Sequence, residues 1–322
     1  MRKLIYTIRA FIKERNHNID IQNNSKYAIN RLEAEIVRNV HSIEKGLSIE
    51  NPRLGFGIAK MNEMFSLVDE YVKLTDNKEV LYFVVDAVDA YIRYHEAKDF
   101  DNKDVLNVKT KCQKLKENMD SHEGVSGGTI ICGRQDDSID IDNVRLLFNT
   151  RHSIREFSEK KVPEETIIEA IKLAQRSPSA CNRQAVRVYS IDGKDYLESM
   201  GNLEGIGGFA QDVDKFLLIT GVQSAYRPGE KNQFIVSASM FAGYLTLSLH
   251  ALGVASCVVQ RNLYADKLYN NFRKKYCIDE DEQLVVMIGI GMPKEETVVP
   301  VSKRLSVNKI YRNLSQNQDL SR

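Results

Sequence analysis

The sequence of 322 residues has almost no excess of charge of either sign. Its 45 Lys and Arg residues are balanced by 44 Asp and Glu residues, which leaves a formal net charge of +1. A chain so close to neutrality has no overall electrostatic field that would attract nucleic acid, so nucleic-acid binding would need a local basic patch. The composition therefore points away from nucleic-acid-binding proteins as a class.

Cysteine and long apolar runs are also scarce. The five Cys residues are scattered, and no two of them have the spacing of zinc ligands. They indicate neither a metal site nor a disulfide framework, and a reducing cytoplasm fits them best. The longest apolar runs are far shorter than a bilayer span, so no transmembrane helix is expected.

Proline is nearly absent from the first 120 residues, where Pro52 is the only one. Apolar residues recur there at helical spacing and predict helices over residues 27–40, 58–74, 80–95 and 105–119. Between the first two helices, the glycines and Pro52 predict a loop over residues 41–57. We therefore predict a helical N-terminal domain over residues 1–122.

The first residues of the chain have an amphipathic pattern of their own. One helical face would carry the apolar side chains of Leu4, Ile5, Ile8, Phe11 and Ile12. A helix that faces the core or a partner is the main interpretation. A basic amphipathic helix on a membrane surface is the alternative, and we do not expect that contact.

The composition changes after the helical region. Residues 123–142 are rich in Gly, Ser and Asp and predict a linker. Helical and strand patterns then alternate over residues 143–313, with few βαβ units, which favours an α+β domain rather than a Rossmann sheet. Residues 314–322 are predicted to form a disordered tail.

Several segments of this second half carry polar and basic side chains. RHSIREF, residues 151–157, could hold a phosphate with its arginine forks and serine hydroxyl, and a solvated basic surface is the alternative. SPSACNRQ, residues 177–184, is a polar turn whose amides suit the edge of a flavin or nucleobase. LGVASCVVQR, IGIGMP and SKRLS follow in order. The glycines of GIGGFA precede a strand instead of following one, so they do not form a dinucleotide-binding fingerprint.

In this order and spacing, the five segments resemble the nitroreductase family of FMN-dependent oxidoreductases over residues 143–312. The resemblance implies an α+β fold in which helices flank a central, mostly antiparallel sheet, here preceded by the helical domain. It also implies a homodimer with FMN at the interface and ping-pong hydride transfer from NAD(P)H, through flavin N5, to a small-molecule acceptor. A catalytically silent flavin-binding or dimerisation module, with a partner-binding helical domain, is the alternative.

The resemblance further implies which residues bind FMN. It assigns the phosphate, the ribityl chain and part of the ring to the first segment, with Arg151, His152, Ser153 and Arg155. It assigns a turn that packs on FMN from the neighbouring subunit to Pro178, Ser179, Ala180 and Asn182. It assigns one ring face to Val258 and Val259, and a backbone donor near N5 to Gln260 and Arg261. It assigns a contact at a strand end to Gly291, and a basic pair on the phosphate to Lys303 and Arg304. No protein side chain is assigned a certain catalytic role, because the flavin carries the redox chemistry.

Two further features concern the substrate. The segment of residues 223–233 is too short for the helical lid of many family members, so the acceptor is left open. In the N-terminal half, HSIEKGLS could bring His41, Glu44 and Lys45 together at a helix end, with Arg53 following. This group could bind an anionic substrate or cover the flavin, and a capped helix end with surface charges is the alternative.

Overall fold

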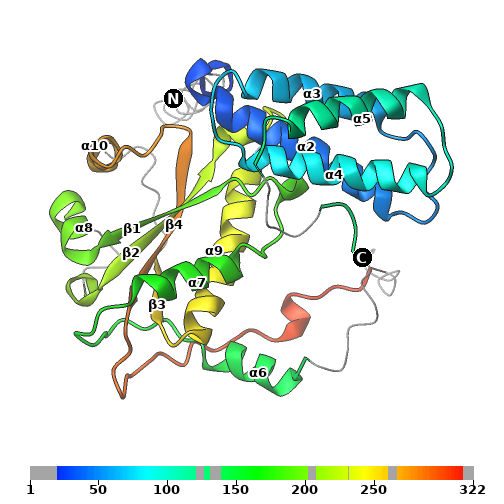
Figure 1. The fold of residues 1–322 in the computed structure, drawn as a ribbon. Coiled ribbons are helices and arrows are strands. Elements are labelled where there is room, and N and C mark those ends of the chain that lie inside the picture. Colours follow the sequence, from blue (N-terminus) through cyan, green and yellow to red (C-terminus); the bar gives the residue numbers. More distant parts are fainter. Residues whose placement is uncertain are drawn as a thin grey trace, which may run out of the picture.

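The computed structural model describes residues 20–120, 127–130, 139–201, 208–230, 232–259 and 267–314. Figure 1 shows a bundle of helices, the helical layer, packed against one end of a part built around a β-sheet, the sheet layer. The expected N-terminal amphipathic helix and most of the predicted linker and tail lie outside the described residues. The proposed domain boundaries therefore stay predictions.

Within residues 25–116, the helical layer contains a short 3-10 turn and four α-helices, which confirms the helices expected from the apolar spacing. They are η1 (Ser25–Tyr27), α2 (Ala28–Ser48), α3 (Ile58–Tyr71), α4 (Glu79–Glu96) and α5 (Lys103–Lys116). The prediction that residues 41–57 form a loop is wrong for its first half, because α2 continues to Ser48. The glycine within this helix, Gly46, leaves room for the Phe56 ring, which would lie 2.1 Å from a Cβ at that position.

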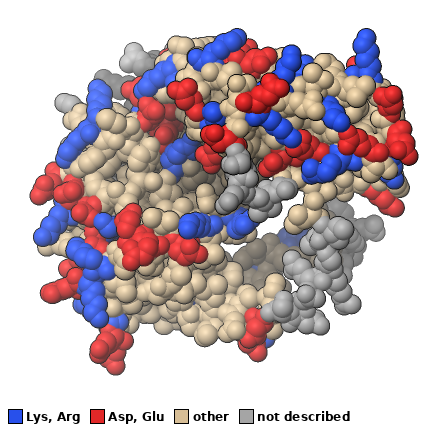
Figure 2. Space-filling model, viewed as in Figure 1, with Lys and Arg blue, Asp and Glu red and all other residues tan. Residues whose placement is uncertain are grey.

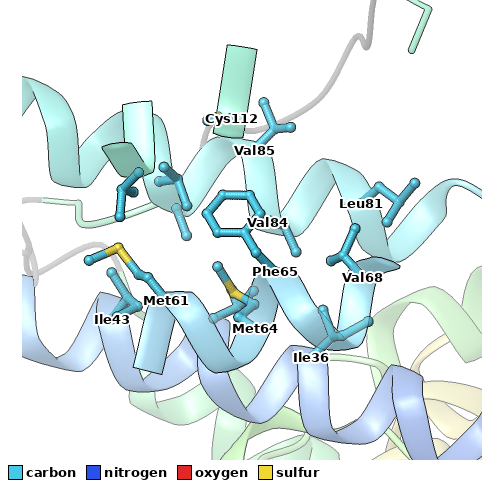
Figure 3. Packing of buried hydrophobic residues seen from close by; sticks show 14 of the residues in the cluster. Ile36, Ile43, Met61, Met64, Phe65, Val68, Leu81, Val84, Val85 and Cys112 are labelled. Carbon is cyan, nitrogen blue, oxygen red and sulfur yellow. The ribbon is translucent and has the colours of Figure 1, made fainter. Parts of the chain in front are cut away.

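A single hydrophobic core holds the four helices together. Figure 3 shows how side chains of α2, α3 and α4 meet, among them Ile36, Met64 and Val84. These three side chains are completely buried. Each helix contributes residues spaced three or four apart, which is the repeat that places them on one helical face. At the start of α5 the Asn102 side chain accepts hydrogen bonds from the next turn and caps the helix.

The sheet layer contains four antiparallel strands in the order β1-β2-β4-β3. They are β1 (Val186–Asp192), β2 (Lys215–Val222), β3 (Ala255–Val259) and β4 (Glu282–Gly291). The central pair β2 and β4 is out of register by a bulge at Ile219/Thr220. This arrangement confirms the predicted antiparallel sheet flanked by helices, and it leaves β3 as an edge strand.

Helices cover both faces of the sheet. One face packs against α7 (Glu164–Ala174) and α9 (Gln233–Ala251), and the other packs against α8 (Gly193–Met200) and α10 (Lys267–Lys275). Along β2, Phe216 and Leu218 point into one core, whereas Leu217 and Ile219 point into the other. Because both faces are buried, this strand has the continuous apolar run seen in the sequence.

The helix α9 is the most apolar helix of the sheet layer. Its length and mean hydropathy would suffice for a membrane span, judged by these two properties alone. Its inner side packs into the core with Ala238, Leu245 and Leu249. Its outer side leaves four large apolar residues exposed, Ile235, Val236, Met240 and Tyr244.

A second exposed apolar region lies at the edge of the sheet layer, and we call it the open margin. It consists of α6 (Ile141–Thr150) and residues 298–314, which include the turn η5 (Val307–Lys309). None of the side chains of α6 is buried. Large exposed apolar residues of the open margin are Ile141, Leu146, Phe148, Val298, Val301, Leu305, Val307, Ile310, Tyr311 and Leu314.

The two layers meet at α2. Ala34 of this helix packs against Ala185, Val222, Ala225 and Tyr226, with Ala180 and Phe234 at the edge of the same cluster. The cluster surrounds two short turns of the sheet layer, η2 (Ala180–Asn182) and η4 (Gln223–Ala225). Polar bonds add to it, since Asn30 donates to the buried carboxylate of Asp281 at 3.0 Å.

Candidate functional site

The segment that follows α6 is fixed along the edge of the sheet. The backbone N–H of Ile154 donates to the Ser256 carbonyl of β3 at 2.9 Å, and that of Ser158 donates to the Met292 carbonyl beyond β4 at 2.9 Å. Between them, Phe157 is buried and forms a bridge with Pro293. The backbone is thus held by the sheet, while Arg151, His152 and Ser153 stay half-exposed and Arg155 is exposed.

The basic side chains of this segment act on β3 and on the end of α9. Burial, reinforced by the nearby positive charges of Arg151 and His152, lowers the pKa of His250. Burial raises the pKa of the Cys257 thiol, and Arg155 and Arg151 oppose that shift. Among the described residues, neither Arg151 nor Arg155 forms an ion pair with a carboxylate. In the part of the chain that the structure describes, the two arginines at this edge of the sheet therefore have no carboxylate partner, which suits a bound anion.

An apolar surface lies beside these charges on β3. Val258 is 44% exposed, whereas its neighbour Val259 is 7% exposed, as expected for side chains that alternate between the two faces of a strand. Val258 therefore offers an open apolar surface for a flat ring. Gln260 and Arg261, expected to supply a backbone donor, lie outside the described residues.

The predicted strand-end contact, Gly291, has a packing role in this structure. It is the last residue of β4, and a Cβ at this position would lie 2.6 Å from the Phe157 ring. The glycine thus allows Phe157 to close the core under the basic segment. A direct contact with a cofactor stays a prediction.

The basic pair near the C-terminus lies in the open margin. Lys303 and Arg304 are exposed, and the Arg304 guanidinium donates to the Ser302 carbonyl two residues earlier. The structure leaves both cationic groups accessible. Their contact with a phosphate stays a prediction.

The polar turn of residues 178–184 is built separately from the basic segment. The Ser179 hydroxyl accepts a hydrogen bond from the Gln184 N–H at 3.0 Å, and the Asn182 N–H donates to the Ser179 carbonyl at 3.0 Å. Ala180 packs against the cluster around Ala34 of α2. The turn therefore adjoins the helical layer, whereas the basic segment adjoins β3.

A search against family models matches residues 149–205 and 210–292 to the nitroreductase family. The match includes the basic segment, the polar turn and all four strands. The sheet layer belongs to the nitroreductase family. The match confirms the family expected from the five sequence segments, and it supports an oxidoreductase activity for this part of the chain.

Individual relatives cover the same nitroreductase region. A protein of Methanothermobacter thermautotrophicus, provisionally named NADH dehydrogenase/NAD(P)H nitroreductase, is 23% identical over 147 residues, which is 45% of this chain and 75% of the relative. The solved FMN-dependent nitroreductase of Clostridium difficile is 22% identical and covers 52% of this chain and 97% of its own, with a TM-score of 0.44. A provisionally named nitroreductase of Desulfovibrio desulfuricans, solved in complex with FMN, is 16% identical over 53% of this chain and 96% of its own, with a TM-score of 0.43.

The charged motif of the helical layer lies outside the nitroreductase match. His41 Nδ1 is 3.7 Å from a Glu44 carboxylate oxygen, and Glu44 also accepts from the Gly128 N–H at 3.4 Å. Lys45 and Arg53 are exposed, and Arg53 lies in the loop beyond the end of α2. The structure thus brings His41 and Glu44 together, while a shared substrate site with Lys45 and Arg53 stays a prediction.

The loop of this motif is organised by aromatic packing. Phe56 lies beside the Tyr91 ring at 5.1 Å, and the Tyr91 hydroxyl donates to the Phe56 carbonyl at 2.7 Å. The buried His95 accepts from the Gly55 N–H through Nε2 at 2.9 Å. Gly55 therefore serves the contact between this loop and α4, whereas Gly46 and Gly57 make room for Phe56 and Ile43.

A set of ion pairs that no sequence motif indicated lies at the junction of the sheet layer and the helical layer. Arg183 binds Glu230, and Arg227 binds Glu35 of α2. The second pair joins residues 192 positions apart in the chain. Arg183 stands inside the SPSACNRQ segment, but no local pattern identifies its partner.

Proposed function

We propose that the protein is an FMN-dependent oxidoreductase that passes hydride from NAD(P)H to a small-molecule acceptor in a ping-pong cycle. One observation carries the proposal, namely a basic segment fixed beside the exposed Val258 face of an edge strand, whose arginines form no ion pair with any residue that the structure describes. This combination suits a molecule with a phosphate at one end and a flat ring at the other. FMN would supply the chemistry of hydride acceptance and release at N5.

The chain's own residues would bind and orient the cofactor. Arg151 and Arg155 would donate to the phosphate, with Ser153 adding a hydroxyl, because guanidinium groups bind phosphate oxygens in a bidentate manner. Val258 would contact one ring face. The backbone between Val259 and Arg261 would direct an N–H towards N5. The exposed Lys303 and Arg304 would reach the phosphate from the open margin.

We propose further that the site is completed in a homodimer. Within one chain, the polar turn adjoins the helical layer, whereas the basic segment adjoins β3. In the proposed homodimer, the turn of one copy would contact the flavin that is bound by the basic segment of the other copy. The open margin and the outer side of α9 expose many large apolar side chains, and soluble monomers rarely leave so much apolar surface uncovered. In Figure 2 charges of both signs cover the helical layer, whereas the lower centre of the view is largely uncharged.

The test is the colour and the size of the purified protein. We expect stoichiometric FMN after denaturation, bleaching of the bound flavin by NADH or NADPH under anaerobic conditions, and reoxidation by quinone or nitroaromatic acceptors. Light scattering should give twice the mass of the 36.7 kDa chain. Stoichiometric FAD, a flavin-loaded monomer, or flavin that neither nicotinamide reduces would contradict the corresponding part of the proposal.

A further inference from the structure

The polar turn has a backbone that non-glycine residues rarely adopt. Cys181, Asn182 and Gln184 have φ angles of 54°, 54° and 52°, so three residues out of four are in the left-handed region. Asn tolerates this region better than most residues, but Cys and Gln do not. A run of this kind persists only where the surrounding structure holds it, and such runs concentrate at functional sites.

Arg183, the third residue of this four-residue run, has an ordinary φ angle, and its side chain is held by residues of the sheet layer. Only 1% of its side chain is exposed, and its two terminal nitrogens bind the two Glu230 oxygens at 2.9 and 3.0 Å. Its guanidinium also lies over the Tyr226 ring, 5.0 Å from the centroid. A bidentate pair with a stacked ring fixes the side chain in one orientation, and with it the backbone between Asn182 and Gln184.

The clamp continues into the helical layer. Glu230 accepts from the Arg227 N–H at 2.9 Å, and the Arg227 side chain binds both oxygens of Glu35 on α2 at 3.0 and 2.7 Å. Glu35 is held in turn by Arg38, which also reaches Glu63 on α3 at 3.4 Å. A continuous chain of charge-assisted bonds therefore runs from the turn to two helices of the other layer.

Apolar packing supports the same path. Ala34 is the neighbour of Glu35 on α2, and it packs in the cluster that includes Ala180 and Ala185 at the two ends of the turn. The side chains of these alanines are short, so α2 approaches the turn closely. Before η1 in the chain, Gln22 donates through its side-chain amide to the Tyr226 carbonyl at 2.6 Å. The helical layer thus contacts the turn directly and through the loop that carries Tyr226, Arg227 and Glu230.

We propose that Arg183, Glu230, Arg227 and Glu35 are positioning residues, and that through them the helical layer sets the geometry of the turn that packs on the flavin ring. This inference rests on the proposed function, since it assigns the turn to the flavin. It gives the helical layer a role in a domain whose own lid segment is short. These residues act through Ser179, Ala180 and Asn182 and do not touch the reacting atoms.

The decisive experiment is a double-mutant cycle on flavin affinity with E35Q, R227Q and the double variant of the full chain. Each single substitution should weaken FMN binding about threefold to fivefold, because it removes one partly exposed bidentate pair. The double variant should be no weaker than either single variant, because both remove the same link. R227K should restore part of the affinity. R183Q should weaken binding about thirtyfold or more, since it leaves Glu230 without its buried partner.

Two controls separate positioning from general stability. K109Q removes an ion pair with Glu96 that joins α4 and α5 at 2.7 Å, away from the turn, and should leave flavin affinity unchanged. Riboflavin should lose as much affinity as FMN in E35Q, because the turn is assigned to the ring and not to the phosphate. The inference would be overturned by unchanged flavin affinity in both E35Q and R227Q, by additive effects in the double variant, or by an equal loss of affinity in K109Q. A wild type that is yellow and reducible would uphold the proposed function in each of these cases. A wild type that binds no flavin would overturn both.

Discussion

Apolar residues at helical spacing are buried in the helical layer but exposed in the open margin. Helices α2 to α5 turn their Ile, Met and Val side chains into one closed core, and Ile36, Met61 and Met64 are completely buried. Helix α6 is amphipathic too, yet none of its side chains is buried. The contrast shows that the described residues of one chain bury the apolar side chains of the helical layer, whereas they leave those of the open margin exposed, as the proposed homodimer would require.

The largest effect should come from the closed region. I36A removes a fully buried side chain from the centre of the helical core and should lower the free energy of unfolding by about 2–5 kcal/mol, because it leaves a cavity as well as lost contacts. Denaturant unfolding monitored by circular dichroism measures this loss. A loss below about 1 kcal/mol would mean that the helical core is not closed as described.

Phosphate binding should show the next largest effect, and it tests the charges next to the open margin and within it. R155A and R304A should each weaken FMN binding by about one to two orders of magnitude, because each removes charge-assisted hydrogen bonds worth about 1.5–3 kcal/mol. Both variants should fold normally, since neither side chain is buried. Fluorescence titration of the apoprotein measures the affinity.

Riboflavin, which lacks the phosphate, is the control ligand for these two variants. It should bind wild type, R155A and R304A with nearly equal affinity. If R304A alone leaves FMN affinity unchanged, the C-terminal basic pair does not hold the phosphate. If both variants leave it unchanged, the phosphate lies elsewhere.

Truncation of an apolar side chain in the open margin should weaken the proposed dimer and leave the stability unchanged, which is the opposite of the effect expected for I36A. Phe148 is 61% exposed, so F148A should leave the stability of the helical layer unchanged. It should weaken the proposed dimer by about 1–2 kcal/mol, or roughly tenfold in its dissociation constant, because a large apolar contact is lost. Sedimentation at several concentrations measures this change, and V72A, which truncates an exposed valine just after α3, is the matched control. Equal dimer constants for F148A and V72A would place the interface elsewhere.

The smallest effect concerns the junction that links the layers. Burial alone would raise the pKa of Glu35, but hydrogen bonds from Arg227 and Arg38 outweigh it and lower the pKa below its ordinary value. The ionised carboxylate therefore stabilises the folded state above its unfolded pKa of about 4.3, and this contribution is lost as the pH falls through the lower folded pKa. The melting temperature of wild type should exceed that of E35Q by a constant amount between pH 5 and 7, corresponding to about 1 kcal/mol or less. The difference should shrink below pH 4, and a difference that grows with acid would contradict the assigned pairing.

Much of the fold could be predicted because its elements have strong local signals. The apolar run of β2 arises from burial on both faces, and the repeats of α3, α4 and α5 arise from one buried face each. The predicted end of α2 was too early because glycine and proline, on which the prediction of the loop rested, usually end a helix. Here the ring of Phe56, ten residues further on, packs against Gly46 and tolerates no side chain there.

The site was only partly predictable for a similar reason. The order of short motifs identified the family and the basic segment, since these residues lie close together in the chain. The clamp on the polar turn depends on Glu230, which is 47 residues from Arg183, and on Glu35, which is 192 residues from Arg227. Nothing local distinguishes these charged residues from those of a solvated surface. Only the folded chain shows that they form one path.

The position of α2 between two cores also orders events during synthesis. Its core with α3, α4 and α5 uses residues up to Met119, so the helical layer can close soon after that length has left the ribosome. Its other side must wait, because Asn30 pairs with Asp281, which follows 251 residues later. In a nascent chain the helical bundle would therefore be folded while the Ala34 side of α2 is still exposed. The sheet layer would then fold against this side of α2.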